Sequence, residues 1–111
     1  MAMSLVIERS GKTARLTLDG ELTIYEVAGI KAELAEVMHG IDEIEIDLGG
    51  IAEIDTAGLQ LMLIAKRNPG KHVRFVNHPP CVLRLIDLAN LGGMLGDPLF
   101  ISATESARNM P

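Results

Sequence analysis

The chain has 111 residues and a formal net charge of -5, and 48% of its residues are hydrophobic against 23% that are charged. This composition fits one globular domain with a single core and argues against a disordered chain. An acidic chain offers no basic footprint for duplex nucleic acid. One Tyr, two Phe and no Trp give no aromatic platform for single strands. We therefore expect no nucleic acid partner.

Cysteine content and apolar run lengths indicate the compartment. Cys81 is the only cysteine, so neither an intrachain disulfide nor a cysteine-based zinc site can form, which fits a reducing compartment. Residues 1–8 carry neither the basic segment nor the apolar stretch of a signal peptide. Charges or turn residues interrupt every apolar run well before the length of a membrane span. The sequence predicts a cytoplasmic protein without direct membrane insertion.

The N-terminal segment is typical of a β-hairpin. Leu5 to Glu8 is a short apolar run, and residues 9–12 form a polar turn. Apolar and polar residues then alternate over 14–18, as in a half-buried strand, until Asp19-Gly20, where we expect the strand to end.

A helix is predicted next. Thr23 stands three residues before Glu26, which is the spacing of a capping box and places the helix start at Thr23. Gly40 is expected to stop the helix. The apolar residues between them follow helical spacing, and they are Val27, Ile30, Leu34, Val37 and Met38.

The middle of the chain predicts a strand and a buried helix. Apolar residues alternate with acidic ones over Ile44 to Leu48, and Gly49-Gly50 is expected to break the strand. Ile51 to Ile54 leads into a short loop. From Ala57 to Arg67 apolar residues cover almost the whole helical circumference, so this helix should be largely buried.

The last third continues the alternation. Val73 to Val76 is a strand candidate, and Pro79-Pro80 are placed to open a third helix. Its inner face should consist of Val82, Leu85, Ile86 and Ala89. We expect a last strand near Leu99 to Ser102, and a helical turn or frayed tail over 103–111. The order β-β-α-β-α-β-α-β predicts an α/β fold with a mixed sheet and parallel βαβ units.

The loop that leads into the second helix is the segment best suited to carry a chemical function. Asp55 and Thr56 stand where unpaired backbone N–H groups and a partial positive charge are expected. A phosphate on Thr56 could be held by the amides that follow, and the small Ala57 and Gly58 would leave the hydroxyl open to another enzyme. Alternatively, Asp-Thr at this place is only a helix cap, worth about 1 kcal/mol.

Nearly the whole chain resembles a stand-alone STAS domain, the fold of anti-sigma factor antagonists. The resemblance rests on four segments, which are Gly20-Glu21-Leu22, the strand 44–48, the loop 54–59, and the strand 73–76 with Pro80 and Val82 after it. It implies a single STAS domain over 1–111, with a mixed sheet of about four to five strands and helices mainly on one side.

The same resemblance implies a function. In phosphorylated members the acceptor directly follows an Asp and precedes a small residue and Gly, which maps onto Thr56. The chain would be a non-enzymatic phosphoswitch without cofactors, whose partner is a serine/threonine kinase or an anti-sigma factor. The phosphosite loop and partner-binding surface would comprise Asp55, Ala57, Gly58, Leu59, Glu21 and Thr23.

Two departures from the antagonist pattern leave alternatives open. Thr23 stands where antagonists commonly have Asp, and the acceptor position holds Thr56 where many members have Ser. The motif Asp-Thr-Ala-Gly-Leu also resembles that of the STAS accessory subunit of an ABC-type lipid-transport ATPase. That subunit would dock through apolar surface near Leu59 and Met62. A STAS module of a chemotaxis or two-component cluster is a third interpretation.

Other candidate features are less specific. The three histidines, His39, His72 and His78, show no metal-ligand spacing, and no serine stands in a nucleophile elbow. We therefore expect no metal site and no catalysis. An apolar group near the C-terminus would cover a sheet edge, dock a partner or support a weak homodimer, and it comprises Leu91, Met94, Leu95 and Leu99.

Overall fold

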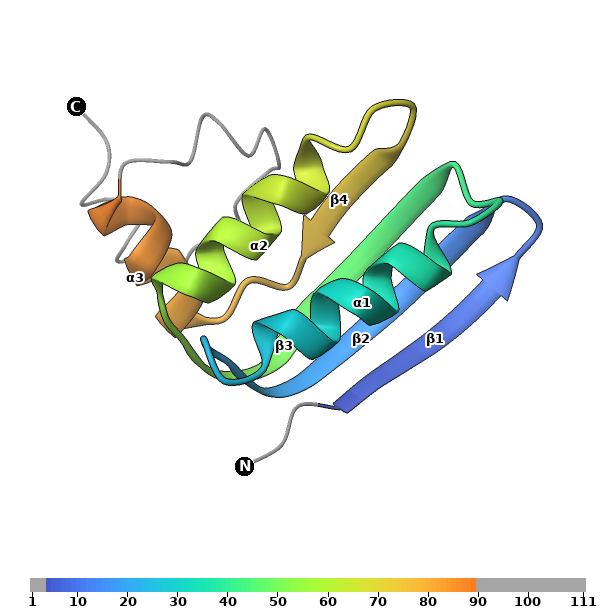
Figure 1. The fold of residues 1–111 in the computed structure, drawn as a ribbon. Coiled ribbons are helices and arrows are strands. Elements are labelled where there is room, and N and C mark those ends of the chain that lie inside the picture. The colour runs from blue at the N-terminus through green and yellow to red at the C-terminus, as the bar shows by residue number, and fades with distance from the viewer. Residues whose placement is uncertain (1–3, 90–111) are drawn as a thin grey trace.

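The predicted strands and helices assemble into a mixed four-stranded sheet with three helices (Figure 1). The structure is a computed structural model, and it describes residues 4–89. The strands are β1 (Ser4–Ser10), β2 (Thr13–Leu22), β3 (Glu43–Ile54) and β4 (His72–Val76). The helices are α1 (Val27–Val37), α2 (Thr56–Lys66) and α3 (Pro80–Leu88).

The strand order along the sheet is β1-β2-β3-β4. β1 and β2 form the predicted antiparallel hairpin, whereas β2, β3 and β4 run parallel to one another. Parallel strands need crossovers, and α1 and α2 provide them. The carboxyl ends of β2 and β3 therefore lie side by side at one end of the sheet, where Leu22 lies opposite Ile54.

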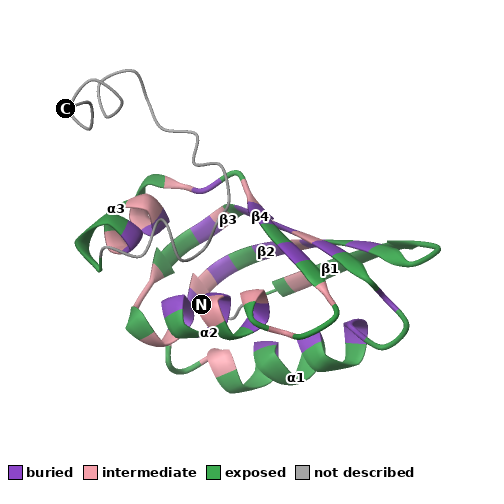
Figure 2. Cartoon of the chain, turned by 90° about the horizontal axis from the view of Figure 1, so that it is seen from above, coloured by how far each residue is buried: buried purple, intermediate pink, exposed green. Residues whose placement is uncertain are grey.

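The period-two pattern of the strands separates an apolar face from a polar one. α1 and α2 cover the apolar face, and α3 lies beside the end of β3 (Figures 1 and 2). This confirms that the helices pack mainly on one side. Burial of this face is the main source of stability. The strand residues buried there are Ala14, Leu16, Leu18, Leu22, Ile44, Ile46, Leu48, Val73 and Phe75.

Two predicted strand ends are wrong. β2 continues through Asp19-Gly20 to Leu22, and β3 continues through Gly49-Gly50 to Ile54. The register between the two strands shifts there, because Thr17 lies opposite Asp47 while Asp19 lies opposite Gly50. A Cβ on Gly50 would lie 2.8 Å from the carbonyl oxygen of Leu18. The glycine pair therefore allows a bulge between closely packed strands.

The predicted start of the first helix is also wrong. α1 begins at Val27, and residues 23–26 form a turn in which the Thr23 carbonyl oxygen accepts hydrogen bonds from the N–H groups of Glu26 and Val27. The N-cap residue, Glu26, makes no side-chain capping hydrogen bond. The predicted stop near Gly40 is confirmed, since α1 ends at Val37 and Gly40 has a φ of 74°.

The remaining predictions on 4–89 hold closely. α2 starts one residue before the predicted Ala57 and ends one residue before Arg67, and Pro80 opens α3. Val82 and Ile86 form the buried face of α3, whereas Ala89 is exposed. The predicted strand at 99–102, the segment 103–111 and the apolar group at 91–99 lie outside the described residues. Between residues 4 and 89, the helices are all too short or too polar to cross a lipid bilayer.

Candidate functional site

The N-terminus of α2 is built around one carboxylate. Asp55 is the N-cap, and its Oδ1 accepts a hydrogen bond from the N–H of Gly58 at 3.0 Å. Its Oδ2 accepts a second from the N–H of Ile24 at 2.9 Å. The first bond is an ordinary helix cap. The second ties the loop between β2 and α1 to the start of α2, so Asp55 fixes two segments that are far apart in the sequence.

Gly58 lies where α2 passes close to the end of β2. A Cβ at this position would clash with the carbonyl oxygen of Leu22 and would lie 2.9 Å from Cγ1 of Ile54. Gly58 is itself buried. Its small size therefore serves the packing of helix against sheet, and it does not widen the access to Thr56 that the sequence suggested.

Thr56 is the first residue of α2, and its side chain is exposed. The first turn of a helix leaves amide groups without intrahelical partners and carries a partial positive charge. Ala57 is half-buried beside it and adds little bulk. The hydroxyl of Thr56 is therefore accessible, on a backbone that Asp55 holds in place.

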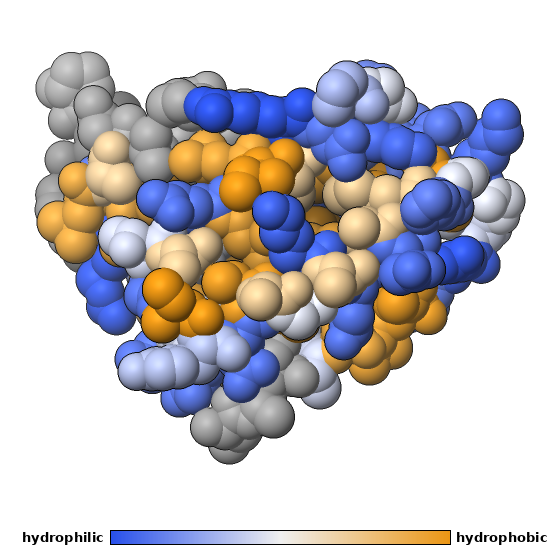
Figure 3. All heavy atoms as spheres, viewed as in Figure 1, coloured by the Kyte–Doolittle hydropathy of each residue, from blue (hydrophilic) through white to orange (hydrophobic). Residues whose placement is uncertain are grey.

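Two exposed apolar residues lie in the loop that Asp55 holds. Tyr25 is 91% exposed and Ile24 is 64% exposed. Figure 3 shows apolar residues reaching the surface on the side of the molecule where α1 and α2 lie. The sequence analysis missed both residues because it placed them inside the first helical turn. The available sign of an exposed loop was their position between the end of a strand and a capping-box pattern that does not start the helix.

The strand ends that lead to Thr56 carry carboxylates. Glu53 is exposed and precedes Asp55 by two residues, and Glu21 is its register partner on β2. Carboxylates from two neighbouring strands thus lie at the strand ends that precede Thr23 and Thr56. We refer to Ile24, Tyr25, Glu53, Asp55 and Thr56 together as the Thr56 surface.

The predicted binding residues divide into two groups. Glu21, Thr23, Asp55, Thr56 and Ala57 are at least partly exposed. Leu59 belongs to the core, with 3% of its surface exposed, and Met62 is 2% exposed. Leu59 and Met62 therefore cannot themselves form the apolar docking face suggested near them, because both side chains are buried in the core. Leu59 supports the site from beneath and does not reach a partner.

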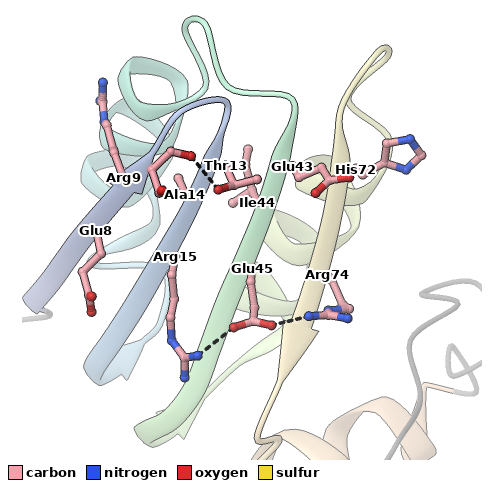
Figure 4. A pocket seen from close by; sticks show the side chains of 11 residues that line it. Glu8, Arg9, Thr13, Ala14, Arg15, Glu43, Ile44, Glu45, His72 and Arg74 are labelled. Atoms are coloured by element: carbon pink, nitrogen blue, oxygen red, sulfur yellow. Dashed lines mark hydrogen bonds and ion pairs between the residues drawn. The ribbon is translucent and has the colours of Figure 1, made fainter.

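A second feature lies on the polar face of the sheet, at the opposite end of the parallel strands. A hollow of about 630 Å³ extends over the starts of β2, β3 and β4 (Figure 4). Charged side chains there pair with one another, since Glu45 bridges Arg15, at 2.9 Å, and Arg74. The hollow is separate from Thr56, which follows the carboxyl end of β3.

Further along this polar face, Asp47 is held by three donors. The N–H of Gly49 donates to Oδ1 at 2.8 Å, and the side chains of Asn77 and Arg15 donate to Oδ2 at 3.0 and 3.1 Å. Burial raises the pKa of Asp47, but the hydrogen bonds from Gly49, Asn77 and Arg15 outweigh it and leave the pKa below its ordinary value.

The histidines are separated in the structure. His39 and His72 are exposed, whereas His78 is buried. Among residues 4–89, no three side chains of His, Cys, Asp or Glu lie close enough together to hold a metal ion.

Comparisons with known proteins agree with this architecture. A sequence model of the family described as "Mlab, STAS domain" matches residues 5–97. No curated protein matches the sequence. The chain is similar in structure to an anti-sigma factor antagonist from Mycobacterium paratuberculosis, with 16% identity and a TM-score of 0.74. That alignment covers 96% of this chain and 92% of the other.

Two structures of a further relative are also similar. One is the anti-sigma factor antagonist SpoIIAA in its unphosphorylated form, with 20% identity, a TM-score of 0.69 and coverage of 97% and 99%. The other is the Bacillus cell fate determinant SpoIIAA in the phosphorylated form, with 19% identity, a TM-score of 0.64 and coverage of 95% and 97%. In each pair the first coverage refers to this chain. At these identities the likeness shows a shared fold, and it confirms the predicted one.

Proposed function

Since this chain belongs to the STAS domain family, we propose that it is a cytoplasmic, non-enzymatic phosphoswitch of the anti-sigma factor antagonist type. In its unphosphorylated form it binds a serine/threonine kinase or an anti-sigma factor through the Thr56 surface. Phosphorylation of Thr56 then releases this partner. Thr56 is the substrate of another enzyme, and the chain itself catalyses nothing.

The observation that carries the proposal is the setting of Thr56. Its hydroxyl is exposed at the first position of α2, while Asp55 beside it is engaged with the N–H groups of Ile24 and Gly58. An acceptor residue must reach a kinase active site without unfolding its own loop, and this arrangement meets that need. The existence of a relative in unphosphorylated and phosphorylated forms supports the same use of the fold.

Electrostatics give the direction of the switch. Phosphorylation adds roughly 1.5 to 2 negative charges. Glu53 and Asp55 already make the surroundings of Thr56 acidic, so the phosphate would have to be desolvated beside like charges in a packed interface. An interface loss of about 3 kcal/mol weakens binding on the order of 100-fold. That is sufficient for a switch.

The contacts of the unphosphorylated form would come from Ile24 and Tyr25. Exposed tyrosines flanked by apolar residues are frequent anchors in protein interfaces. Because the nearby charges are carboxylates, the partner surface should combine an apolar pocket with basic residues at its rim.

The test is a capture experiment from lysate of the native host, with partners identified by mass spectrometry. The baits are wild type, Thr56→Ala, Thr56→Glu and the control Thr13→Glu, which adds the same charge at an exposed threonine of the distant hairpin. We expect a serine/threonine kinase or anti-sigma factor on every bait except Thr56→Glu. The purified pair should then show a Kd on the order of 100-fold higher for Thr56→Glu.

Two results would contradict the proposal. Equal binding of Thr56→Ala and Thr56→Glu by the captured kinase or anti-sigma factor would remove Thr56 as the switch. Recovery of an ABC ATPase in place of those partners would assign the chain to lipid transport and make Thr56 an interface contact. A recovered kinase should also phosphorylate wild type and not Thr56→Ala, as intact-mass measurement would show.

A further inference from the structure

β1 forms one edge of the sheet in the described part of the chain (Figure 1). It pairs with β2 over all seven of its residues, from Ser4 to Ser10, without a shift in register. The other side of such a strand presents backbone N–H and C=O groups that can template a further strand.

The side chains of β1 leave this edge open to association. Val6 is 53% exposed and Ile7 is 38% exposed, on opposite faces of the strand. Proteins usually protect an edge strand with charged side chains, above all lysine, with proline or with a bulge. Residues 4–10 contain no lysine, proline or bulge, and their two charged side chains, Glu8 and Arg9, are of opposite sign. Within residues 4–89, the edge therefore combines an unpaired backbone side with the exposed apolar side chains of Val6 and Ile7.

We propose that β1 pairs antiparallel with β1 of a second copy of this chain, about a two-fold axis that passes through Ile7. Ile7 is the middle of the strand, so this register pairs the strand over its full length. It places Ile7 opposite Ile7 of the second copy, Val6 opposite Glu8, and Leu5 opposite Arg9. Closed two-fold dimers are the commonest assemblies of soluble proteins.

The faces of the sheet agree with this register. Leu5 and Ile7 lie on the apolar face, since their register partners on β2 are the buried Leu18 and Leu16. Residues directly opposite each other in an antiparallel pair project to the same face. An axis through Ile7 therefore joins apolar face to apolar face, and the dimer has one continuous sheet of eight strands, twice the four of each copy.

The charges of β1 disfavour registers that are shifted toward Ser10. An axis through Glu8 would oppose two carboxylates, and an axis through Arg9 would oppose two guanidinium groups, and like charges directly opposite each other destabilise a strand pair. An axis through Ile7 opposes no like charges. It also leaves Glu8 beside Arg15, its register partner on β2.

The dimer does not depend on the proposed phosphoswitch. Thr56 follows the carboxyl end of β3, and the two sheets run in opposite directions across the axis. The two Thr56 surfaces therefore lie at opposite ends of the dimer and stay open to partners. Failure of one proposal leaves the other standing.

A charge exchange at the axis tests the register. Ile7→Lys and Ile7→Glu each place like charges opposite each other, so sedimentation equilibrium should show a dimer Kd raised about tenfold or more for each variant alone. An equimolar mixture opposes Lys and Glu, and it should recover the dimer as a heterodimer. Ile24→Lys and Ile24→Glu change an exposed apolar residue outside β1, and each should dimerise as wild type does. Circular dichroism checks that all four variants are folded.

Crosslinking gives a second test that keeps the edge intact. In a Cys81→Ser background, Ile7→Cys should form a disulfide-linked dimer, because opposed residues have Cα atoms about 4.5 to 5.5 Å apart. Ser10→Cys should not, since its two copies would lie about 20 Å apart along the strands. A wild-type chain that stays monomeric at millimolar concentration would overturn the proposal. The proposal would also be overturned if the equimolar mixture of Ile7→Lys and Ile7→Glu did not dimerise. Crosslinking of Ser10→Cys as efficient as that of Ile7→Cys would overturn it as well.

Discussion

The carboxylate of Asp55 accepts a hydrogen bond from the backbone N–H of Ile24 at 2.9 Å, across 31 residues of sequence. The same carboxylate caps α2 through Gly58. The exposed residues Ile24 and Tyr25 and the accessible Thr56 thus depend on one side chain for their relative position. The recognition and modification that we propose for the Thr56 surface would therefore be coupled through Asp55.

Asp55→Ala should therefore destabilise the fold more than the loss of a simple cap does. A cap is worth about 1 kcal/mol, and a second hydrogen bond to a charged acceptor adds about 1.5 kcal/mol. We expect the free energy of unfolding to fall by about 2 to 3 kcal/mol in urea titrations. Glu53→Ala, an exposed carboxylate two residues earlier, should change it by less than about 0.5 kcal/mol. Equal effects of the two substitutions would show that Asp55 does not join the two segments.

This relationship could not be predicted from local sequence. Thr23 and Glu26 have the spacing of a capping box, and that pattern placed a helix start at Thr23. In the structure the side chain that fixes this turn comes from Asp55, which the parallel pairing of β2 with β3 brings alongside. Capping patterns describe contacts within one turn, whereas this contact depends on tertiary structure.

The close packing at Gly58 predicts an unusual sign for a helical glycine substitution. Gly→Ala in a helix normally stabilises by up to about 1 kcal/mol. At Gly58 the new methyl group would clash with the Leu22 carbonyl oxygen, and overpacking costs about 1 to 3 kcal/mol. We expect Gly58→Ala to lower the free energy of unfolding by at least about 1 kcal/mol.

Gly29 provides the matched control. It lies within α1, is exposed, and a Cβ there would meet nothing within 4 Å. Gly29→Ala should raise the free energy of unfolding by up to about 1 kcal/mol in the same urea titrations. The expectation fails if both substitutions shift the unfolding midpoint in the same direction.

The sequence predicted the core better than the edges of its elements. Alternation over 44–48 and the apolar circumference of 57–67 correctly indicated a buried strand and a buried helix. Gly49-Gly50 was interpreted as a break because glycine usually ends strands, yet here it permits a bulge opposite Asp19. Whether a glycine ends a strand or allows a close approach depends on the neighbouring chain. Leu59 lies in the helix that the sequence predicted to be buried, and it is buried; its place on a partner-binding surface came from the family resemblance.

Asp47 gives a pH dependence with a defined sign. Its pKa in the folded state is lower than the ordinary value of 3.8, so its hydrogen bonds stabilise the fold above that value. The contribution disappears as the pH falls through the folded-state pKa. Asp47→Asn removes the charged acceptor at all pH values. The stability difference between wild type and Asp47→Asn should therefore be largest near neutral pH and should shrink as the pH falls below 3.8, the ordinary pKa of an aspartate.

Urea unfolding of both proteins from neutral to strongly acidic pH measures this difference directly. Unfolding slopes that agree between the two proteins at each pH would show that the same transition is compared. A stability difference that stays constant down to the acid end would mean that Asp47 gains nothing from Gly49, Asn77 and Arg15 as a charged group.

Ile24 and Tyr25 should separate binding from stability. Both are exposed, at 64% and 91%, so truncation removes little packing and should change the free energy of unfolding by less than about 0.5 kcal/mol. If they anchor the partner, Tyr25→Ala should weaken binding by about 2 kcal/mol, or roughly 30-fold, and Ile24→Ala by about tenfold. Isothermal titration with the partner captured on the wild-type bait gives these values.

Leu88→Ala provides the control, because it removes a similarly exposed apolar side chain from α3, at 82%. It should leave the affinity unchanged, because α3 lies outside the Thr56 surface. A partner that tolerates both loop substitutions but not Leu88→Ala would place the interface on α3 and leave Thr56 without a binding role.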